Sequence, residues 1–228
     1  MSISPNFLLE ADDHPIRLRT ERGRRTPRVV AYLTMTLFAL LLNGCLSRPA
    51  LVRQTFALQG PLATNASART GDGVLLVASC NVSPLFSGRS LVYRTGENSY
   101  EQDPSAGFLI PPAEDFGIAV RQYLRSGAAF RDVVEPGGIL PPDRLAEVQV
   151  TELYGDFRAT DRPTAVLTIR FKFIRAGGEG KPPMVFLEKL ATRSVPLREK
   201  TAVGVVAAWN QGLAEIMNEV AAGLSARP

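Results

Sequence analysis

Thiols and imidazoles are the side chains that ionise most readily near neutral pH, and this sequence of 228 residues has two cysteines, Cys45 and Cys80, and one histidine, His14. The two thiols have different surroundings. Cys80 ends the apolar run 74–80, VLLVASC, so we expect it to be buried and unreactive. Cys45 instead follows an apolar stretch and a glycine near the N-terminus. This position indicates covalent modification of Cys45 rather than catalysis.

The segment before Cys45 has the organisation of a secretory signal. Arg24, Arg25 and Arg28 precede 14 uncharged, mostly apolar residues, 29–42, which Asn43 and Gly44 follow. Residues 42–45, Leu-Asn-Gly-Cys, resemble the bacterial lipobox, although a small or β-branched residue is usual where Asn43 stands. The cysteine of a lipobox receives a thioether-linked diacylglycerol and then an N-acyl chain. We therefore predict that Cys45 is lipidated and that Cys80 has no disulfide partner.

Two other interpretations of this segment stay open. One is a transmembrane anchor, although a membrane span needs roughly 20 apolar residues and 14 fall short. The other is an ordinary cleaved signal with Cys45 near the cut by accident. We divide the chain into a signal peptide with an extended n-region (1–44), a lipidated tether (45–53) and one domain (54–226). Residues 45–56 span at most about 40 Å, which keeps the domain close to its membrane.

The charge and the motifs exclude several classes of function. Removing residues 1–44 takes away six arginines, four acids and the only histidine, which leaves 20 basic and 18 acidic side chains. No basic run supports nucleic-acid binding. Neither G-x-S-x-G, a P-loop nor H-E-x-x-H occurs. The glycines at 177–180 separate two expected strands, and Glu114-Asp115 suit a helix N-terminus. We therefore expect that the protein is not an enzyme and that it binds neither a cofactor nor a metal ion.

The remaining pattern predicts an α+β domain with a mostly antiparallel sheet and two main helices packed against it. Apolar residues at helical spacing indicate helices over 112–125 and 200–224. Residues 165–174 alternate most clearly. Thr168, Arg170 and Lys172 lie on a wet face, and the alternate residues lie on a buried face: Ala165, Leu167, Ile169, Phe171 and Phe173. The other expected strands are 54–58, 74–79, 90–94, 99–102, 130–134, 146–154 and 184–195, and we expect residues 103–107 to break the pattern.

This order of elements resembles the ABC-type transport auxiliary lipoproteins over about residues 54–226. The resemblance rests on Phe56-x-Leu58, Pro84-x-Phe86-x-Gly88-x-x-Leu91-Val92-Tyr93-Arg94, Phe130-x-x-Val133, three strands and the long helix at 201–224. The family often has a tryptophan where this chain has Phe108, which fills the same pocket but lacks the indole N–H. These proteins are the lipoprotein partners of Mce-type and paraquat-inducible transport systems in double-membraned bacteria.

The resemblance implies a non-enzymatic lipoprotein on the periplasmic side of the outer membrane. It implies docking to an Mce-domain protein, with a permease and an ATPase in the same assembly, and transport of lipids between the membranes. Leu46 after Cys45 agrees with outer-membrane sorting as known in enteric bacteria. Two other functions stay open: a lipoprotein for outer-membrane assembly or cell-wall-synthase activation, and a lipid carrier with an apolar pocket.

A docking subunit needs an exposed surface that the core does not explain. Aromatic residues and an arginine gather in the stretch 86–108, and Tyr and Arg are the residue types that most often anchor interfaces. The alternative is that two or three of these aromatic residues complete the core. Our candidate partner-binding residues are Phe86, Tyr93, Arg94, Tyr100 and Phe108.

Overall fold

The computed structural model describes residues 29–35, 53–61, 71–178 and 180–225. The chain divides into two compact units, Met1–Ala50 and Leu51–Pro228. In the first unit, residues 29–35 are helical. No helix within the described residues is long and apolar enough to cross a membrane. Cys45, the rest of the proposed signal and most of the tether lie outside the described residues.

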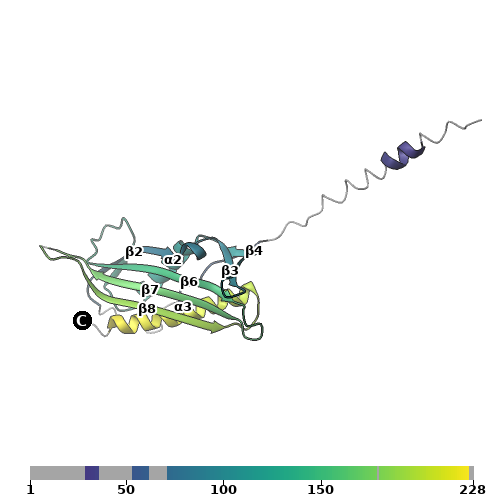
Figure 1. Cartoon of the computed structure of the whole chain (residues 1–228). Helices are drawn as coiled ribbons and strands as arrows, with labels where there is room; N and C mark the ends of the chain where they lie inside the picture. The colour runs from purple at the N-terminus through teal and green to yellow at the C-terminus, as the bar shows by residue number, and fades with distance from the viewer. Residues whose placement is uncertain (1–28, 36–52, 62–70, 179, 226–228) are drawn as a thin grey trace, which may run out of the picture. The chain divides into compact units, whose positions relative to one another are not determined.

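The second unit contains one sheet of eight strands and two long helices (Figure 1). The helices expected at 112–125 and 200–224 are confirmed within two residues at each end. In chain order the elements are β1 (Gln54–Phe56), β2 (Val74–Val82), the short 3-10 helix η2 (Pro84–Phe86), β3 (Ser90–Arg94), β4 (Tyr100–Phe108), α2 (Pro112–Ser126), β5 (Asp132–Val134), β6 (Arg144–Asp156), β7 (Thr164–Arg175), β8 (Met184–Pro196) and α3 (Ala202–Ser225).

The α+β class is confirmed, but the sheet is mixed rather than purely antiparallel. β7 pairs antiparallel with β6 and β8 along its whole length, and β3 with β4. In contrast, β2 and β3 both lie parallel to β6, β5 lies parallel to β2, and β1 lies parallel to β4. Parallel neighbours need a long crossover. The whole stretch from β3 to β5 provides that crossover between β2 and β6.

Both long helices cover the same face of the sheet. Tyr123 on α2 donates a hydrogen bond to the Asn218 Oδ1 on α3 over 2.7 Å, and α3 runs beneath β7 and β8 (Figure 1). The predicted alternation of β7 is confirmed, because its residues at 165, 167, 169, 171 and 173 are all buried against this layer. The opposite face has no α-helix within the described residues. Arg170 on this face is exposed, whereas Thr168, which the sequence predicted on the same wet face, is buried.

Strand β4 differs from the prediction, which had the pattern broken at residues 103–107. The strand continues to Phe108 despite Pro104. The Asp103 carboxylate explains this, because it accepts hydrogen bonds from the N–H groups of Ser105 and Ala106 at 2.8 and 2.9 Å. Pro104 faces no ladder partner, since β1 pairs only with residues 106–108. Proline is tolerated at such an edge position.

Candidate functional site

Polar and aromatic side chains lie together at one end of the sheet. In register, Arg94 lies opposite Asp156, Asp156 opposite Thr164, and Thr164 opposite Pro196. The turn 95–99, the loop 157–163 and the segment 197–201 therefore meet at this edge, which we call the hairpin end. Arg94 and Tyr100 from the sequence-based list lie here.

Arg94 is held over two aromatic rings at the hairpin end. Its guanidinium carbon lies 5.7 Å from the ring centroid of Tyr100 and 5.9 Å from that of Tyr154. Its Nη2 donates to the Glu97 carbonyl over 2.6 Å, and its Nε donates to the Gly96 carbonyl over 3.3 Å. Arg94 therefore fixes the β3–β4 turn while its charge stays on the polar face of the sheet. Each cation–π contact contributes about 0.5–1 kcal/mol at an exposed site.

The rings below Arg94 form a small aromatic cluster. Phe86 stacks on Tyr154 with ring centroids 5.7 Å apart, and Tyr100 meets both rings edge-on at 6.1 and 5.8 Å. Phe86 is only 4% exposed, so it supports this cluster from below rather than offering its own surface. Burial raises the pKa of Tyr154, which keeps its phenol protonated. We call Arg94, Tyr100 and Tyr154, with Phe86 beneath them, the arginine platform.

Tyr93 takes part in a neighbouring cluster. Its ring stacks on Phe157 with centroids 4.7 Å apart, and its hydroxyl donates to the Asp103 carboxylate over 2.6 Å. Burial is the larger of the causes that raise the pKa of Tyr93, and the hydrogen bond to Asp103 raises it further. Lys200 lies over the Phe157 ring, 4.9 Å from its centroid. Tyr93 thus fastens β3 to β4 and to the loop after β6.

Phe108 lies apart from the other candidates, in the core under α3. It is 2% exposed and stacks on Trp209 at 5.8 Å. The structure therefore brings together Phe86, Arg94 and Tyr100, places Tyr93 beside them, and separates Phe108. The sequence-based list lacks Tyr154 and Asp156, which come from β6. Their distance from the 86–108 stretch in sequence hides this contact, which only the parallel β3–β6 pairing creates.

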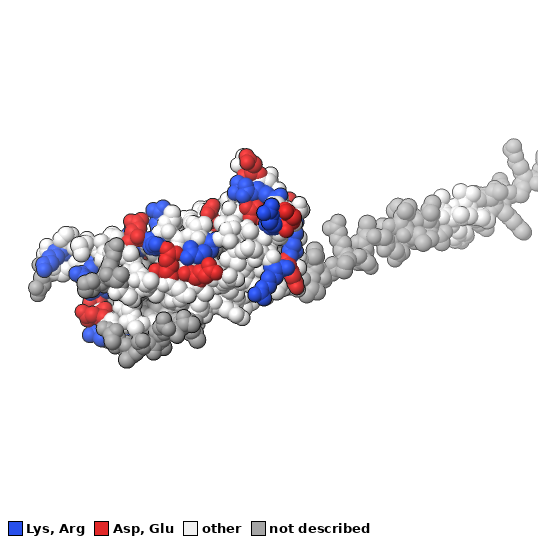
Figure 2. Space-filling model, turned by 90° about the horizontal axis from the view of Figure 1, so that it is seen from below, with Lys and Arg blue, Asp and Glu red and all other residues white. Residues whose placement is uncertain are grey.

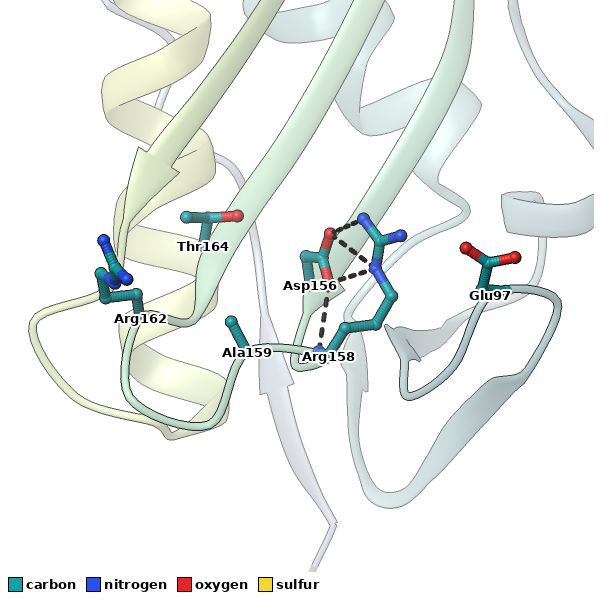
Figure 3. A pocket seen from close by; sticks show the side chains of 6 residues that line it. All are labelled: Glu97, Asp156, Arg158, Ala159, Arg162 and Thr164. Carbon is teal, nitrogen blue, oxygen red and sulfur yellow. Dashed lines mark hydrogen bonds and ion pairs between the residues drawn. The ribbon is translucent and has the colours of Figure 1, made fainter.

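A pocket of about 300 Å³ lies at the hairpin end, where the β3–β4 turn and the loop after β6 meet (Figure 3). Asp156 and Arg158 form an ion pair in its wall, with the Arg158 Nη2 2.6 Å from the Asp156 Oδ2. The hydrogen bonds from Arg158 lower the pKa of Asp156, so the carboxylate is ionised at neutral pH. The residues lining the pocket are Glu97, Asp156, Arg158, Ala159, Arg162 and Thr164.

Neither the arginine platform nor the pocket resembles a metal centre or a surface that binds nucleic acid. Within the described residues, no three His, Cys, Asp or Glu side chains lie close enough together to hold a metal ion. On the face shown in Figure 2, acidic and basic side chains are mingled, in keeping with a net charge of only +4. The hairpin end offers aromatic area, directed hydrogen bonds and paired charges. These groups suit recognition of another molecule.

Comparisons with known proteins agree with this fold. The domain resembles the crystal structure of protein XCC0632 from Xanthomonas campestris, a DUF330 protein, with a TM-score of 0.62 at 16% identity over 73% of this chain and 92% of that one. It also resembles a crystal structure of an uncharacterized protein, with a TM-score of 0.58 at 15% identity over 76% and 99% of the two chains. A comparison with curated proteins gives no match.

The family model described as "ABC-type transport auxiliary lipoprotein component" matches residues 56–221, which is nearly the whole domain from β1 to α3. This family consists of auxiliary components of transport systems and is not a known enzyme family. The chain belongs to the ABC-type transport auxiliary lipoprotein family.

Proposed function

We propose that this protein is the lipid-anchored docking subunit of an Mce-type ABC transport system that moves lipids between the inner and outer membranes. The observation that carries the proposal is the family match over residues 56–221, which associates the chain with an ABC transport system. In this proposal the domain lies on the periplasmic face of the outer membrane and binds the Mce-domain protein, whose permease and ATPase belong to the same assembly.

The lipid on Cys45 is the proposed anchor. The chain from Cys45 to Arg53 reaches at most about 30 Å when fully extended. Gln54 pairs with Ala106, six residues along β4 from Tyr100 at the hairpin end, which is about 20 Å at the usual rise of a strand. These lengths together, about 50 Å, allow the hairpin end to reach the membrane surface.

The arginine platform is the proposed docking surface. Arg94 and Tyr100 are partly exposed, and the buried Phe86 beneath them fixes their positions. Interface hot spots commonly have this construction, with an Arg or Tyr side chain that is ordered before binding and therefore loses little entropy on binding. Tyr93 and Phe108 support the surface indirectly, by holding β3 and β4 in place.

Co-purification tests both parts of this proposal. The full-length protein should co-purify with the Mce-domain protein encoded beside it. The double variant Arg94→Ala with Tyr100→Ala should weaken that association at least tenfold. Because Arg94 also bonds the β3–β4 turn, Tyr100→Ala alone is measured in parallel, and melting temperatures are compared. Arg175→Ala is a control for the loss of an accessible arginine, since Arg175 is exposed and lies at the opposite end of β7.

The outcomes separate the competing functions. Normal co-purification of a stable double variant removes the arginine platform from consideration but leaves the docking function. Failure of the wild-type protein to bind any Mce-domain protein would favour outer-membrane assembly or cell-wall-synthase activation instead. A lipid carrier would need an apolar cavity, and the pocket at the hairpin end is lined mainly by charged side chains.

A further inference from the structure

The end of the sheet opposite the hairpin end, which we call the far end, exposes large apolar side chains. Ile139 is fully exposed and three others are about half exposed: Leu140, Met184 and Val185. In register, Met184 lies opposite Arg175, and Arg175 lies opposite Arg144 at the start of β6. The loop 135–143 leads into that start, and the loop 176–183 leads into β8. Both loops at the far end therefore carry or adjoin exposed apolar groups (Figure 1).

A row of apolar side chains crosses the sheet between these two loops. Leu145 on β6 lies opposite Ile174 on β7, and Ile174 lies opposite Val185 on β8. All three are at least partly exposed. They alternate with Ala146 and Phe173, which are buried on the helix-covered face, so the row lies on the opposite face. The exposed apolar groups thus extend over three strands instead of standing singly, which distinguishes them from ordinary surface side chains.

Tight turns hold both loops in place. The Gly138 N–H donates to the Glu135 carbonyl over 3.0 Å, and the Lys181 N–H donates to the Gly178 carbonyl over 2.9 Å. The third residue of each turn is a glycine with a φ of 83° or 82°, at residues 137 and 180, as a type II turn requires. Prolines restrict the backbone around both turns, at positions 136, 141, 142, 182 and 183. This order lowers the entropy that the loops lose when they bind.

Basic side chains at the far end are available to a negatively charged surface. Arg175 and Lys181 are exposed, and no ion pair within the described residues uses either of them. The acids Asp143 and Glu135 each already form an ion pair with an arginine, over 3.1 and 3.5 Å. Glu179 lies outside the described residues; with it included, the segment 175–183 has two basic residues and one acidic residue, a formal charge of +1. The far end therefore combines apolar groups with a local positive charge.

This combination suits a lipid surface better than a protein partner. Protein interfaces are commonly anchored by aromatic and arginine side chains that fit a complementary surface. The exposed far-end groups are instead non-aromatic and lie on or beside loops that close the end of the sheet. A lipid surface accepts such groups without a matched shape, and anionic headgroups attract nearby lysine and arginine. We infer that the far end contacts an anionic phospholipid surface, with Ile139, Leu140 and Met184 entering the headgroup layer beside Arg175 and Lys181.

The contact also determines which way the arginine platform points. The 13 residues of β6 separate the far end from the hairpin end by about 40 Å. A far end on the membrane therefore presents the platform away from the lipid, where a partner can reach it. Through the pairings of β4 and β3, Gln54 lies roughly 30 Å from the far end, and the extended tether from Cys45 reaches about as far. Only this consequence rests on the proposed docking function; the lipid contact does not.

Fluorescence quenching in the full-length protein tests the contact. The protein is reconstituted in vesicles of phosphatidylethanolamine and phosphatidylglycerol that contain lipids with a nitroxide on the headgroup. In a Cys80→Ala background, a fluorescent label is placed on Ile139→Cys or, as the matched control, on Asn98→Cys, which is exposed in the turn at the hairpin end. Mass spectrometry confirms one label per chain. The label at residue 139 should be quenched about threefold more than the label at residue 98, because its side chain enters the headgroup layer. Equal quenching at both positions, or stronger quenching at residue 98, would overturn the inference.

A second arm tests the charge and the alternative partner. Arg175→Gln with Lys181→Gln, or phosphatidylcholine in place of phosphatidylglycerol, should reduce quenching at residue 139 about twofold. The control Arg162→Gln with Arg198→Gln removes two exposed arginines at the hairpin end and should leave it unchanged. Quenching that is equal in all these samples would overturn the requirement for anionic lipid. A label at residue 139 that lipid does not quench, but whose emission shifts when the Mce-domain protein is added, would show that the far end binds a protein instead. Co-purification with that protein and membrane release of Cys45→Ala are measured separately, so failure of docking or of the anchor is distinguished from failure of the far-end contact.

Discussion

Phe108 lies almost flat on Trp209, with ring centroids 5.8 Å apart and planes inclined by 13°. Both rings are at most 2% exposed, and the indole N–H donates to the Val166 carbonyl over 3.1 Å. This pair joins the end of β4, the strand β7 and the helix α3 in one contact. It explains why Phe108 belongs to the core, although it lies near the partly exposed Tyr100 in sequence.

Replacing Trp209 should therefore lower the stability of the whole domain. Trp209→Ala leaves a cavity under the sheet and removes the hydrogen bond to the Val166 carbonyl, and we expect a loss of about 3–5 kcal/mol in the free energy of unfolding. Urea unfolding followed by circular dichroism measures this loss, since Trp209 is the only tryptophan. Leu109→Ala, an exposed neighbour of Phe108, is the control. An unchanged unfolding midpoint for Trp209→Ala would contradict the packing described above.

Replacing Thr168 tests how much a hydrogen bond on the polar face of the sheet contributes to stability. Its hydroxyl is expected on the wet face, yet the residue is 5% exposed, and it donates to the Glu152 carboxylate over 2.5 Å. Thr168→Val keeps the shape and removes this bond, so we expect a loss of about 1–2 kcal/mol in stability. The exposed Thr192, 3.0 Å from Thr168, is the control, and Thr192→Val should cost less. Equal effects would mean that the bond to Glu152 is not the cause.

The Asp156–Arg158 pair gives the domain a predicted dependence on pH. The hydrogen bonds from Arg158 lower the pKa of Asp156 in the folded state relative to about 3.9 in the unfolded chain. The stabilisation is therefore fully present above pH 4 and is lost as the pH falls through the folded pKa. Asp156→Asn should lower the melting temperature at pH 7, and its melting temperature should approach that of wild type as the pH falls below the folded pKa of Asp156. A difference that persists unchanged at acid pH would exclude this linkage.

The thiol of Cys80 should be inert in the folded protein. Burial raises its pKa to about 12, partly offset by the charge of Arg121. At pH 8 the thiol is then protonated, and thiolate reagents should react with it only after unfolding. If Cys45 is lipidated, Ellman's reagent should detect no thiol in the native protein and one in the unfolded protein. One thiol in the native state would indicate that Cys45 is unmodified or that Cys80 is accessible.

The anchor itself is tested by replacing Cys45. Cys45→Ala should release a folded domain from the membrane fraction, because stable anchoring requires at least two acyl chains, at about 0.8 kcal/mol for each buried CH₂. Carbonate washing of membranes followed by immunoblotting measures the release, with Cys80→Ala as the control that should stay bound. Continued retention of Cys45→Ala would mean that the apolar segment before it anchors the chain.

Local pattern was enough to predict most of the elements. Proline followed by Glu114 and Asp115 predicts the start of α2, and period-two alternation predicts the buried face of β7; both are confirmed. These features depend on contacts between near neighbours or on which side of an element is apolar. The short pattern Leu91-Val92-Tyr93-Arg94 also led to the family that the comparison identifies.

The strand pairings and the site depended on the tertiary structure. Nothing near Arg94 in sequence indicates that Tyr154 and Asp156 lie beside it, because a parallel pairing joins segments about 60 residues apart. The same holds for Phe108, whose burial depends on Trp209, about 100 residues further along the chain. Periodicity shows which side of a strand is buried, but the partner across the sheet is chosen by how all the strands and helices together enclose their apolar surface.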